Sequence, residues 1–134
     1  MTGITALLLF AAWTLALMLT YVFYRTGLVM AGRKRADSWT RDRPTDDPGF
    51  VVRAQHAHMN CVENLPVFAA IVLGAYALGR PAVADGVAPY VLGARLAQST
   101  VHLIGVNHWL VFVRGSLFTI QVVLFLYMTW ELLL

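Results

Sequence analysis

The sequence of 134 residues is poor in charge, glycine, proline and cysteine. Charged residues make up 13% of the chain, whereas a soluble domain usually carries about a quarter. This deficit argues against a soluble globular protein, and also against disorder, which requires low hydrophobicity and high charge. The 10 glycines and 5 prolines are too few for a fibrous or low-complexity chain. Cys61 is the single cysteine, so no intrachain disulfide can form.

Apolar residues dominate what remains. They form 59% of the chain, and the mean hydropathy is +0.67. The net charge of +3 could suggest a nucleic-acid partner, but the basic residues interrupt apolar runs and do not cover a polar fold. We therefore expect an integral membrane protein without a nucleic-acid partner. The length allows one domain, covering residues 1–134.

Long apolar runs predict four transmembrane helices. Residues 1–24 carry no charge, which suffices for one crossing at roughly 20 residues per span. This run lacks the basic start of a secretory signal peptide, so we expect a retained helix. The second run covers residues 51–79, and residues 86–134 fit two more helices joined by a turn at 105–108. The runs do not alternate with period two, so the predicted fold is an all-α bundle of four transmembrane helices.

The distribution of basic residues predicts the orientation. Residues 25–49 form a polar loop, whereas the other polar connection, residues 80–86, offers one arginine. The charged residues of the long loop are Arg25, Arg33, Lys34, Arg35, Asp37, Arg41, Asp42, Arg43, Asp46 and Asp47. By the positive-inside rule this first loop is expected to be cytoplasmic, with both termini on the opposite side.

Polar side chains recur on one face of each of the last three helices. An ionisable group inside a membrane costs at least ~2.5–3.5 kcal/mol and usually faces the bundle interior or a wet cavity. At about 100° per residue, the members of each set share a face. The sets are Arg53, His56, Asn60 and Glu63, then Arg95, Gln98 and His102, and finally Arg114 and Gln121.

These side chains allow two interpretations. They can tie the helices together, with Glu63 pairing with Arg95 or Arg114 and the amides bonding between helices. That role explains poorly why so many ionisable residues gather on three helices, so a polar binding site is the other interpretation. A metal site is not expected, because His56 and His58 point about 160° apart on a helix. Nothing marks Cys61 as activated, so we expect a buried structural thiol.

One run in the second predicted helix resembles a known family signature. Residues 53–68, RAQHAHMNCVENLPVF, resemble the motif of the membrane-associated proteins in eicosanoid and glutathione metabolism, the MAPEG family. The shared features are Arg53, then Asn60, Glu63 and a Pro-x-Phe that ends at Phe68. Chain length, four spans, a basic first loop and Arg114 near the start of the last helix also agree. The resemblance covers essentially the whole chain.

The resemblance implies a homotrimer that binds glutathione between neighbouring subunits near the cytoplasmic surface. Arg114 matches the arginine that holds the glutathione thiolate. The other expected glutathione ligands are Arg53, His56, Asn60, Glu63, Arg95, Gln98 and His102. The chain departs from the pattern of well-studied members at His56, at His102 in place of a tyrosine, at Gly115 in place of a hydroxyl residue, and at Phe118.

The expected function is a glutathione-dependent transferase or peroxidase that acts on lipophilic electrophiles dissolved in the bilayer. The run from Arg95 to His102 is typical of bacterial members, so the expected location is a bacterial inner membrane, with periplasmic termini. One alternative is a membrane binding or structural protein that has lost catalysis. A small four-helix transporter is a further alternative, although those rely on a carboxylate in the first helix, and residues 1–24 contain none.

Overall fold

The chain forms four long helices in the residues that the structure, a computed structural model, describes, which are 1–41 and 43–134. The elements are α1 (Gly3–Met30), the short 3-10 helix η1 (Ala36–Trp39), α2 (Gly49–Ala77), α3 (Pro81–Ile104) and α4 (His108–Leu133). The prediction of an all-α four-helix bundle is confirmed. Asp42, which the sequence places in the long loop, lies outside the described residues.

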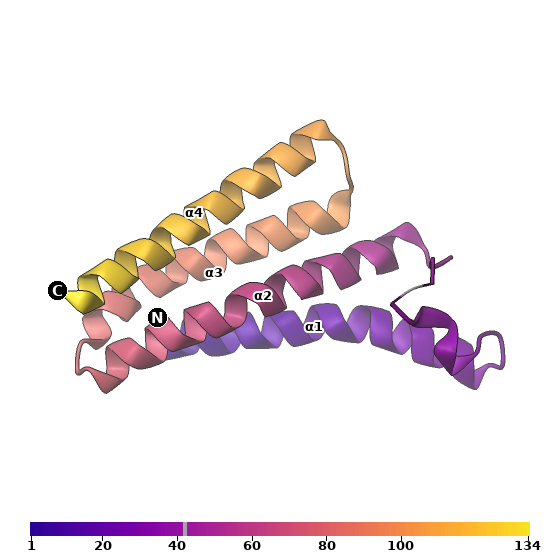
Figure 1. Cartoon of the computed structure of the whole chain (residues 1–134), viewed down its shortest axis with the longest axis horizontal. Coiled ribbons are helices and arrows are strands. Elements are labelled where there is room, and N and C mark those ends of the chain that lie inside the picture. Colours follow the sequence, from indigo (N-terminus) through magenta and orange to yellow (C-terminus); the bar gives the residue numbers. More distant parts are fainter. Residues whose placement is uncertain (42) are drawn as a thin grey trace.

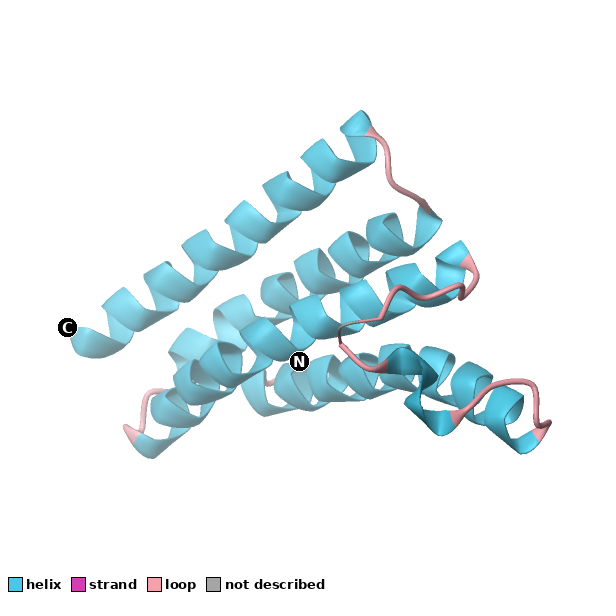
Figure 2. Ribbon diagram, turned by 45° about the vertical axis from the view of Figure 1, so that its right-hand side comes forward, coloured by secondary structure: helices cyan, strands magenta, loops and turns pink. Residues whose placement is uncertain are grey.

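The helices run side by side in an up-and-down arrangement. Figure 1 shows both termini at the end that holds the α2–α3 turn, opposite the long loop and the α3–α4 turn. Figure 2 shows the long loop, which includes η1, passing from the end of α1 to the start of α2. Helix α1 packs on α2 and α3, whereas α4 packs mainly on α3.

Local sequence explains where the helices begin and end. The Thr2 side chain accepts a hydrogen bond from the backbone N–H of Thr5 at 3.1 Å, and Asn107 caps α4 in the same way. Gly79 adopts φ +69°, a conformation that favours glycine, and so closes the short turn before Pro81. Pro81 starts α3, where a missing N–H does no harm.

Two predicted boundaries are wrong. Helix α1 continues to Met30, so Arg25 belongs to a helix and not to the loop. The helix can include this charged residue because the guanidinium donates hydrogen bonds to Asp47 and to Gln55. The second polar connection is also shorter than the predicted residues 80–86, because α3 already begins at Pro81. The predicted turn at 105–108 is confirmed within one residue, since α3 ends at Ile104 and α4 begins at His108.

Aromatic side chains connect three helices in the core. The Phe68 ring on α2 lies 5.7 Å from that of Phe10 on α1 and 5.8 Å from that of Phe125 on α4, measured between ring centroids. At the end of the bundle near the termini, Asp85 accepts hydrogen bonds from the Gly3 backbone N–H and from the Tyr76 hydroxyl. These contacts fix α1, α2 and α3 against one another.

Three of the helices, α1, α2 and α4, are long and apolar enough to cross a membrane. Helix α3 has 24 residues and carries more polar side chains, but Arg95, Gln98, Ser99 and His102 are buried inside the bundle. The outward faces of the helices carry large apolar side chains, as expected where lipid is the solvent. The chain is therefore a membrane protein.

Candidate functional site

A partly polar cavity of about 260 Å³ lies where α2, α3 and α4 face one another. Its lining residues are Asn60, Glu63, Gln98, Val111, Arg114, Gly115 and Phe118. Four of the eight side chains predicted for a binding site, Asn60, Glu63, Gln98 and Arg114, thus come together from three helices. This cavity is the candidate functional site.

Arg114 brings a positive charge to the cavity without a partner for it. Among the described residues, its side chain makes no hydrogen bond or salt bridge with another protein group. Glu63 lies on the same cavity and is exposed, yet within residues 1–41 and 43–134 it forms no salt bridge with Arg95 or Arg114. The helix-tying ion pairs considered from the sequence are therefore not formed.

Arg95 lies behind the cavity wall. Its side chain is fully buried, and its Nη1 donates a hydrogen bond to Oδ1 of Asn60 at 2.9 Å. Its Cζ lies 5.3 Å from the Phe10 ring centroid, in a cation–π contact. Arg95 is not among the residues that line the cavity, so within one subunit it touches the site through Asn60.

Gln98 is supported from α4 in a similar way. The Gln121 side chain is fully buried, and its Nε2 donates to Oε1 of Gln98 at 2.9 Å. The same Nε2 also donates to the backbone carbonyl of Leu117 at 3.2 Å. The spacing of seven residues between Arg114 and Gln121 places both on one face of α4, but it does not reveal the pairing with Gln98.

The remaining predicted site residues lie nearer the long loop. Arg53 donates from Nε to the backbone carbonyl of Leu103 at 2.9 Å, and the His56 and His102 rings lie 6.2 Å apart between centroids. None of these three predicted residues lines the 260 Å³ cavity. His56 instead lines a second polar cavity of about 250 Å³, together with Arg25, Trp39, Thr40, Arg41, Arg43, Thr45 and Gln55.

An ion pair with little exposure to solvent joins Arg25 of α1 to Asp47 of the long loop, and no sequence pattern predicted it. Arg25 Nε donates to Oδ2 of Asp47 at 2.9 Å, and Trp39 Nε1 donates to Oδ1 of the same carboxylate at 2.9 Å. Burial raises the pKa of Asp47, but hydrogen bonds from Trp39, Arg25 and Thr45 and the charge of Arg25 outweigh it and leave the pKa below its usual value. We call Arg25, Trp39 and Asp47 the loop clamp.

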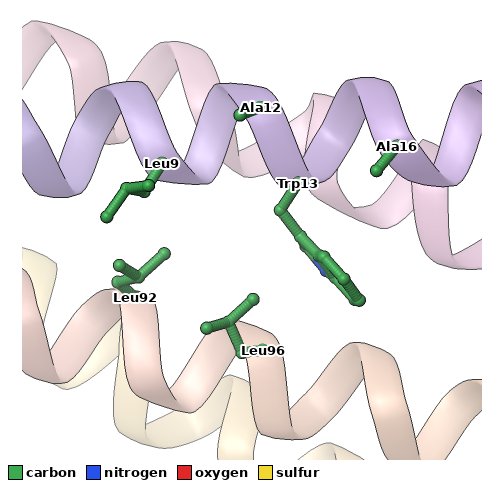
Figure 3. A pocket seen from close by; sticks show the side chains of 6 residues that line it. All are labelled: Leu9, Ala12, Trp13, Ala16, Leu92 and Leu96. Atoms are coloured by element: carbon green, nitrogen blue, oxygen red, sulfur yellow. The ribbon is translucent and has the colours of Figure 1, made fainter.

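A third cavity, of about 350 Å³, lies between α1 and α3 and is almost entirely apolar. Figure 3 shows Leu9, Ala12, Trp13 and Ala16 on α1 facing Leu92 and Leu96 on α3. Leu92 and Leu96 come roughly 120–160° around α3 from Gln98. A molecule in this apolar cavity would therefore not reach Arg114 of the same subunit.

The cysteine follows its prediction. Cys61 is fully buried, and its Sγ lies 3.7 Å from the Ser99 hydroxyl oxygen. This is a weak hydrogen bond between α2 and α3. The thiol thus contributes to helix packing, and Cys61 does not line the polar cavity.

The sequence was compared with known families, proteins and structures. The sequence model described as the MAPEG family matches residues 3–134, which is essentially the whole chain. No curated protein and no solved structure gives a significant match.

Proposed function

Because the chain belongs to the MAPEG family, we propose that it is a glutathione-dependent membrane transferase or peroxidase that acts on lipophilic electrophiles. Family membership supports a membrane function related to glutathione in general terms. The single observation that carries the more specific proposal is Arg114, a cation without a protein partner among the described residues. It lines a partly polar cavity and belongs to α4, a helix long and apolar enough to cross a membrane. Such a group requires an anion, because an uncompensated charge away from water is costly.

Glutathione has the groups that this cavity would recognise. It carries two carboxylates, one ammonium and a thiol, so its site needs cationic and amide donors together with a carboxylate. Arg114, Asn60 and Gln98 supply donors, and Glu63 supplies the carboxylate. In this proposal Arg53, His56, Arg95 and His102 complete the site, either directly or, for Arg95, through Asn60.

Arg114 can supply the energy needed to ionise the thiol. Lowering a thiol pKa from about 8.5 to about 7 requires about 2 kcal/mol. One guanidinium within about 4 Å, at an effective dielectric near 20, offers around 4 kcal/mol before desolvation. Since α4 begins at His108, Arg114 lies nearly two turns inside the helix, where the helix dipole adds little. The guanidinium itself must therefore stabilise the thiolate.

The thiolate would then act as the nucleophile. In a conjugation its sulfur forms a bond to the electrophilic carbon, the leaving group departs with its electron pair, and the thiol proton is released to water. Val111 and Phe118 line the same cavity and are exposed. They offer an apolar edge at which an electrophile dissolved in the bilayer can reach the sulfur.

A single subunit provides only part of the proposed site. Its cavity of about 260 Å³ is smaller than the roughly 300–1,000 Å³ of ordinary small-molecule sites. His56 and Glu63 are also exposed on α2. We therefore propose that a homotrimer completes the site between neighbouring subunits.

The proposed location is a bacterial inner membrane, with the long loop cytoplasmic and both termini periplasmic. The basic residues of the loop support this orientation. A reporter that is active only in the periplasm should work when fused after Leu134 and fail when inserted between Arg33 and Lys34. The reverse result would place the site on the wrong side for cytosolic glutathione.

The Arg114→Ala variant tests the proposed role of the guanidinium. We expect a folded oligomer that binds glutathione weakly through Asn60 and Glu63. The ultraviolet absorbance of bound thiolate should disappear at neutral pH, and conjugation to a nitro-substituted aryl halide should fall at least about tenfold. Arg114→Lys should recover only part of the activity, because a point charge replaces a planar fork.

A matched control is Arg80→Ala, since Arg80 is exposed in the α2–α3 turn. It should leave both the thiolate signal and the conjugation rate unchanged. Full thiolate signal and turnover in Arg114→Ala would exclude Arg114 from the chemistry. Calorimetry on the wild-type protein that shows no heat with millimolar glutathione would favour the non-catalytic alternative.

A further inference from the structure

The two amide side chains on the polar cavity are each held at their oxygen end. We infer that Arg95 and Gln121 are positioning residues that turn Asn60 and Gln98 so that both amides present only N–H groups to the cavity. In consequence, the site selects ligand groups that accept hydrogen bonds. The two positioning residues would thus set the binding specificity of the cavity, which rests on the proposed function only where glutathione is used as the probe.

The orientation of Asn60 follows from the chemistry of its partner. Arg95 Nη1 lies 2.9 Å from Oδ1 of Asn60. A guanidinium can only donate hydrogen bonds, so the atom that faces it has to be the amide oxygen. The full burial of Arg95 keeps this donor in place, because few alternative rotamers fit a packed interior. The Nδ2 end of Asn60 is then left for the cavity.

The orientation of Gln98 is fixed through one further step. Gln121 Nε2 lies 3.2 Å from the backbone carbonyl of Leu117 and 2.9 Å from Oε1 of Gln98. A backbone carbonyl can only accept, so the Gln121 atom beside it is its nitrogen. That nitrogen donates to Gln98, which must therefore present its oxygen to Gln121 and its nitrogen elsewhere. Both assignments therefore follow from partners that can play only one role, a guanidinium that donates and a backbone carbonyl that accepts.

Both amide nitrogens remain open to the cavity. In the part of the chain that the structure describes, the buried side-chain atoms without a partner are Trp13 Nε1, Arg95 Nε, Arg95 Nη2 and Gln121 Oε1. The nitrogens of Asn60 and Gln98 are not in this set, although neither has a protein partner among the described residues. They are accessible, and both residues line the cavity.

The wall of the cavity is consequently one-sided in its hydrogen bonding. Asn60, Gln98 and Arg114 offer donors, and the Glu63 carboxylate is the one charged acceptor among the lining side chains. A carboxylate or a thiolate fits three donors, whereas an ester or an amide N–H at the same place satisfies them less well. Arg95 and Gln121 would thus set specificity without touching the ligand.

Amide hydrogen exchange tests the orientation without any ligand. The chain has three glutamines, Gln55, Gln98 and Gln121, so protein labelled with ¹⁵N at glutamine gives three side-chain NH₂ signals, which single Gln→Leu variants assign. We expect the Gln121 protons to exchange slowly and the Gln98 protons to exchange quickly. A protected Gln98 and a rapidly exchanging Gln121 would overturn the inference, whether or not glutathione binds.

Ligand discrimination tests the consequence. The probes are glutathione and its diethyl ester, which lacks both carboxylate charges, and the readout is the ratio of their dissociation constants. In Gln121→Leu we expect this ratio to shrink roughly two- to tenfold, the range for one hydrogen bond. The control variant Gln55→Leu should keep the wild-type ratio, because Gln55 does not line the cavity of Asn60 and Gln98. If Gln121→Leu weakened the binding of both probes equally, Gln121 would have only a packing role and the inference would be wrong.

The Arg95 pair gives a second test of the same ratio. Arg95→Lys keeps a donor toward Asn60 and should retain most of the discrimination, whereas Arg95→Met should lose it. If Arg95→Met fails to fold, the Gln121 variants and the exchange pattern still decide the inference. Failure of the wild-type protein to bind either probe would count against the proposed function, and the exchange pattern would then decide the inference alone.

Discussion

Asp46 and Asp47 are neighbours in the sequence with very different surroundings. The Asp46 side chain is 72% exposed and pairs with Lys34, whereas the Asp47 side chain is 1% exposed and receives the donors of the loop clamp. An exposed ion pair contributes little to stability, whereas loss of one partner of a buried one leaves the other uncompensated. The two residues therefore form a matched pair for mutation.

We expect Asp47→Asn to loosen the loop, because Arg25 and Trp39 lose the charged acceptor that they share. Trypsin should cut after the loop residues Arg33 to Arg41 about ten times faster than in the wild-type protein, as expected when a hydrogen bond to a charged group is lost. Asp46→Asn should change the rate little. Equal cleavage of the two variants would show that the clamp does not order the loop.

Acid should have the same effect as this substitution. The folded protein lowers the pKa of Asp47 below its unfolded value of about 3.9. The clamp therefore contributes its full stability above about pH 4, and this contribution is lost as the pH falls through the lower folded pKa. Trp39 fluorescence, isolated by subtraction of a Trp39→Phe variant, should stay constant from pH 7 to 5 and change only below pH 4.

Single residues differ in how far the sequence predicts them. Helical periodicity brought Asn60 and Glu63 to one face, and the cavity contains both. Periodicity says nothing about contacts between elements, so it missed Gln121 as the partner of Gln98 and Arg25 as the partner of Asp47. The burial of Arg95 also depends on how Phe10 of α1 packs against it, which only the assembled bundle defines.

At the scale of the elements, α1 packs tightly against α2 and α3 beside Gly3. A Cβ atom added to Gly3 would lie 2.9 Å from Cβ of Ala84 and 3.3 Å from a methyl carbon of Val72. Helix α1 can therefore approach its neighbours here only because the first helical residue lacks a side chain. The Gly3–Asp85 hydrogen bond depends on the same approach.

We expect Gly3→Ala to push these helices apart and to lower the free energy of unfolding by about 1–3 kcal/mol. Gly86→Ala is the control, because Gly86 is likewise a helical glycine, in α3, and a Cβ there meets no atom within 4 Å. Thermal unfolding in a mild detergent would measure both variants. A Gly3→Ala variant as stable as the control would show that the helix ends adapt without cost.

The helices themselves and the turn at 105–108 were predictable from apolar runs, but the end of α1 and the start of α3 were not. The charge on Arg25 suggested the end of the first helix, yet α1 continues to Met30 because the loop clamp neutralises that charge. Likewise, the polar residues 80–86 read as a connection, although Pro81 begins a helix and Asp85 is held by Gly3 and Tyr76. In both places tertiary contacts override the local signal.

At the scale of the whole molecule, α4 is the helix with least cover. Only Gln121, Phe125 and Met128 are buried along its 26 residues, and it packs mainly on α3. Glu63 and His56 are exposed as well. Ionisable side chains at membrane depth usually face other protein or a wet cavity, so further subunits are the natural cover.

We therefore expect an oligomer with three times the mass of the 14.8 kDa subunit. Native mass measurement in a mild detergent would check this, with circular dichroism to show that the helices persist. A helical protein that stays monomeric under these conditions would contradict the trimer, and it would leave the proposed site with only the residues of one subunit.

The length of α1 has a consequence for the membrane itself. From Gly3 to Arg25 the helix axis rises about 33 Å, which is slightly more than the roughly 30 Å of an average hydrocarbon layer. With Gly3 at one edge of the hydrocarbon layer, the loop clamp would lie just beyond the acyl chains at the other edge. Tyr21, in cation–π contact with Arg25, would then lie at the headgroup level. A bilayer a few ångströms thicker would bring the clamped charges into hydrocarbon, whereas a thinner one is accommodated by tilt. The length of α1 therefore limits how thick a bilayer can be before the charges of the loop clamp enter its hydrocarbon layer.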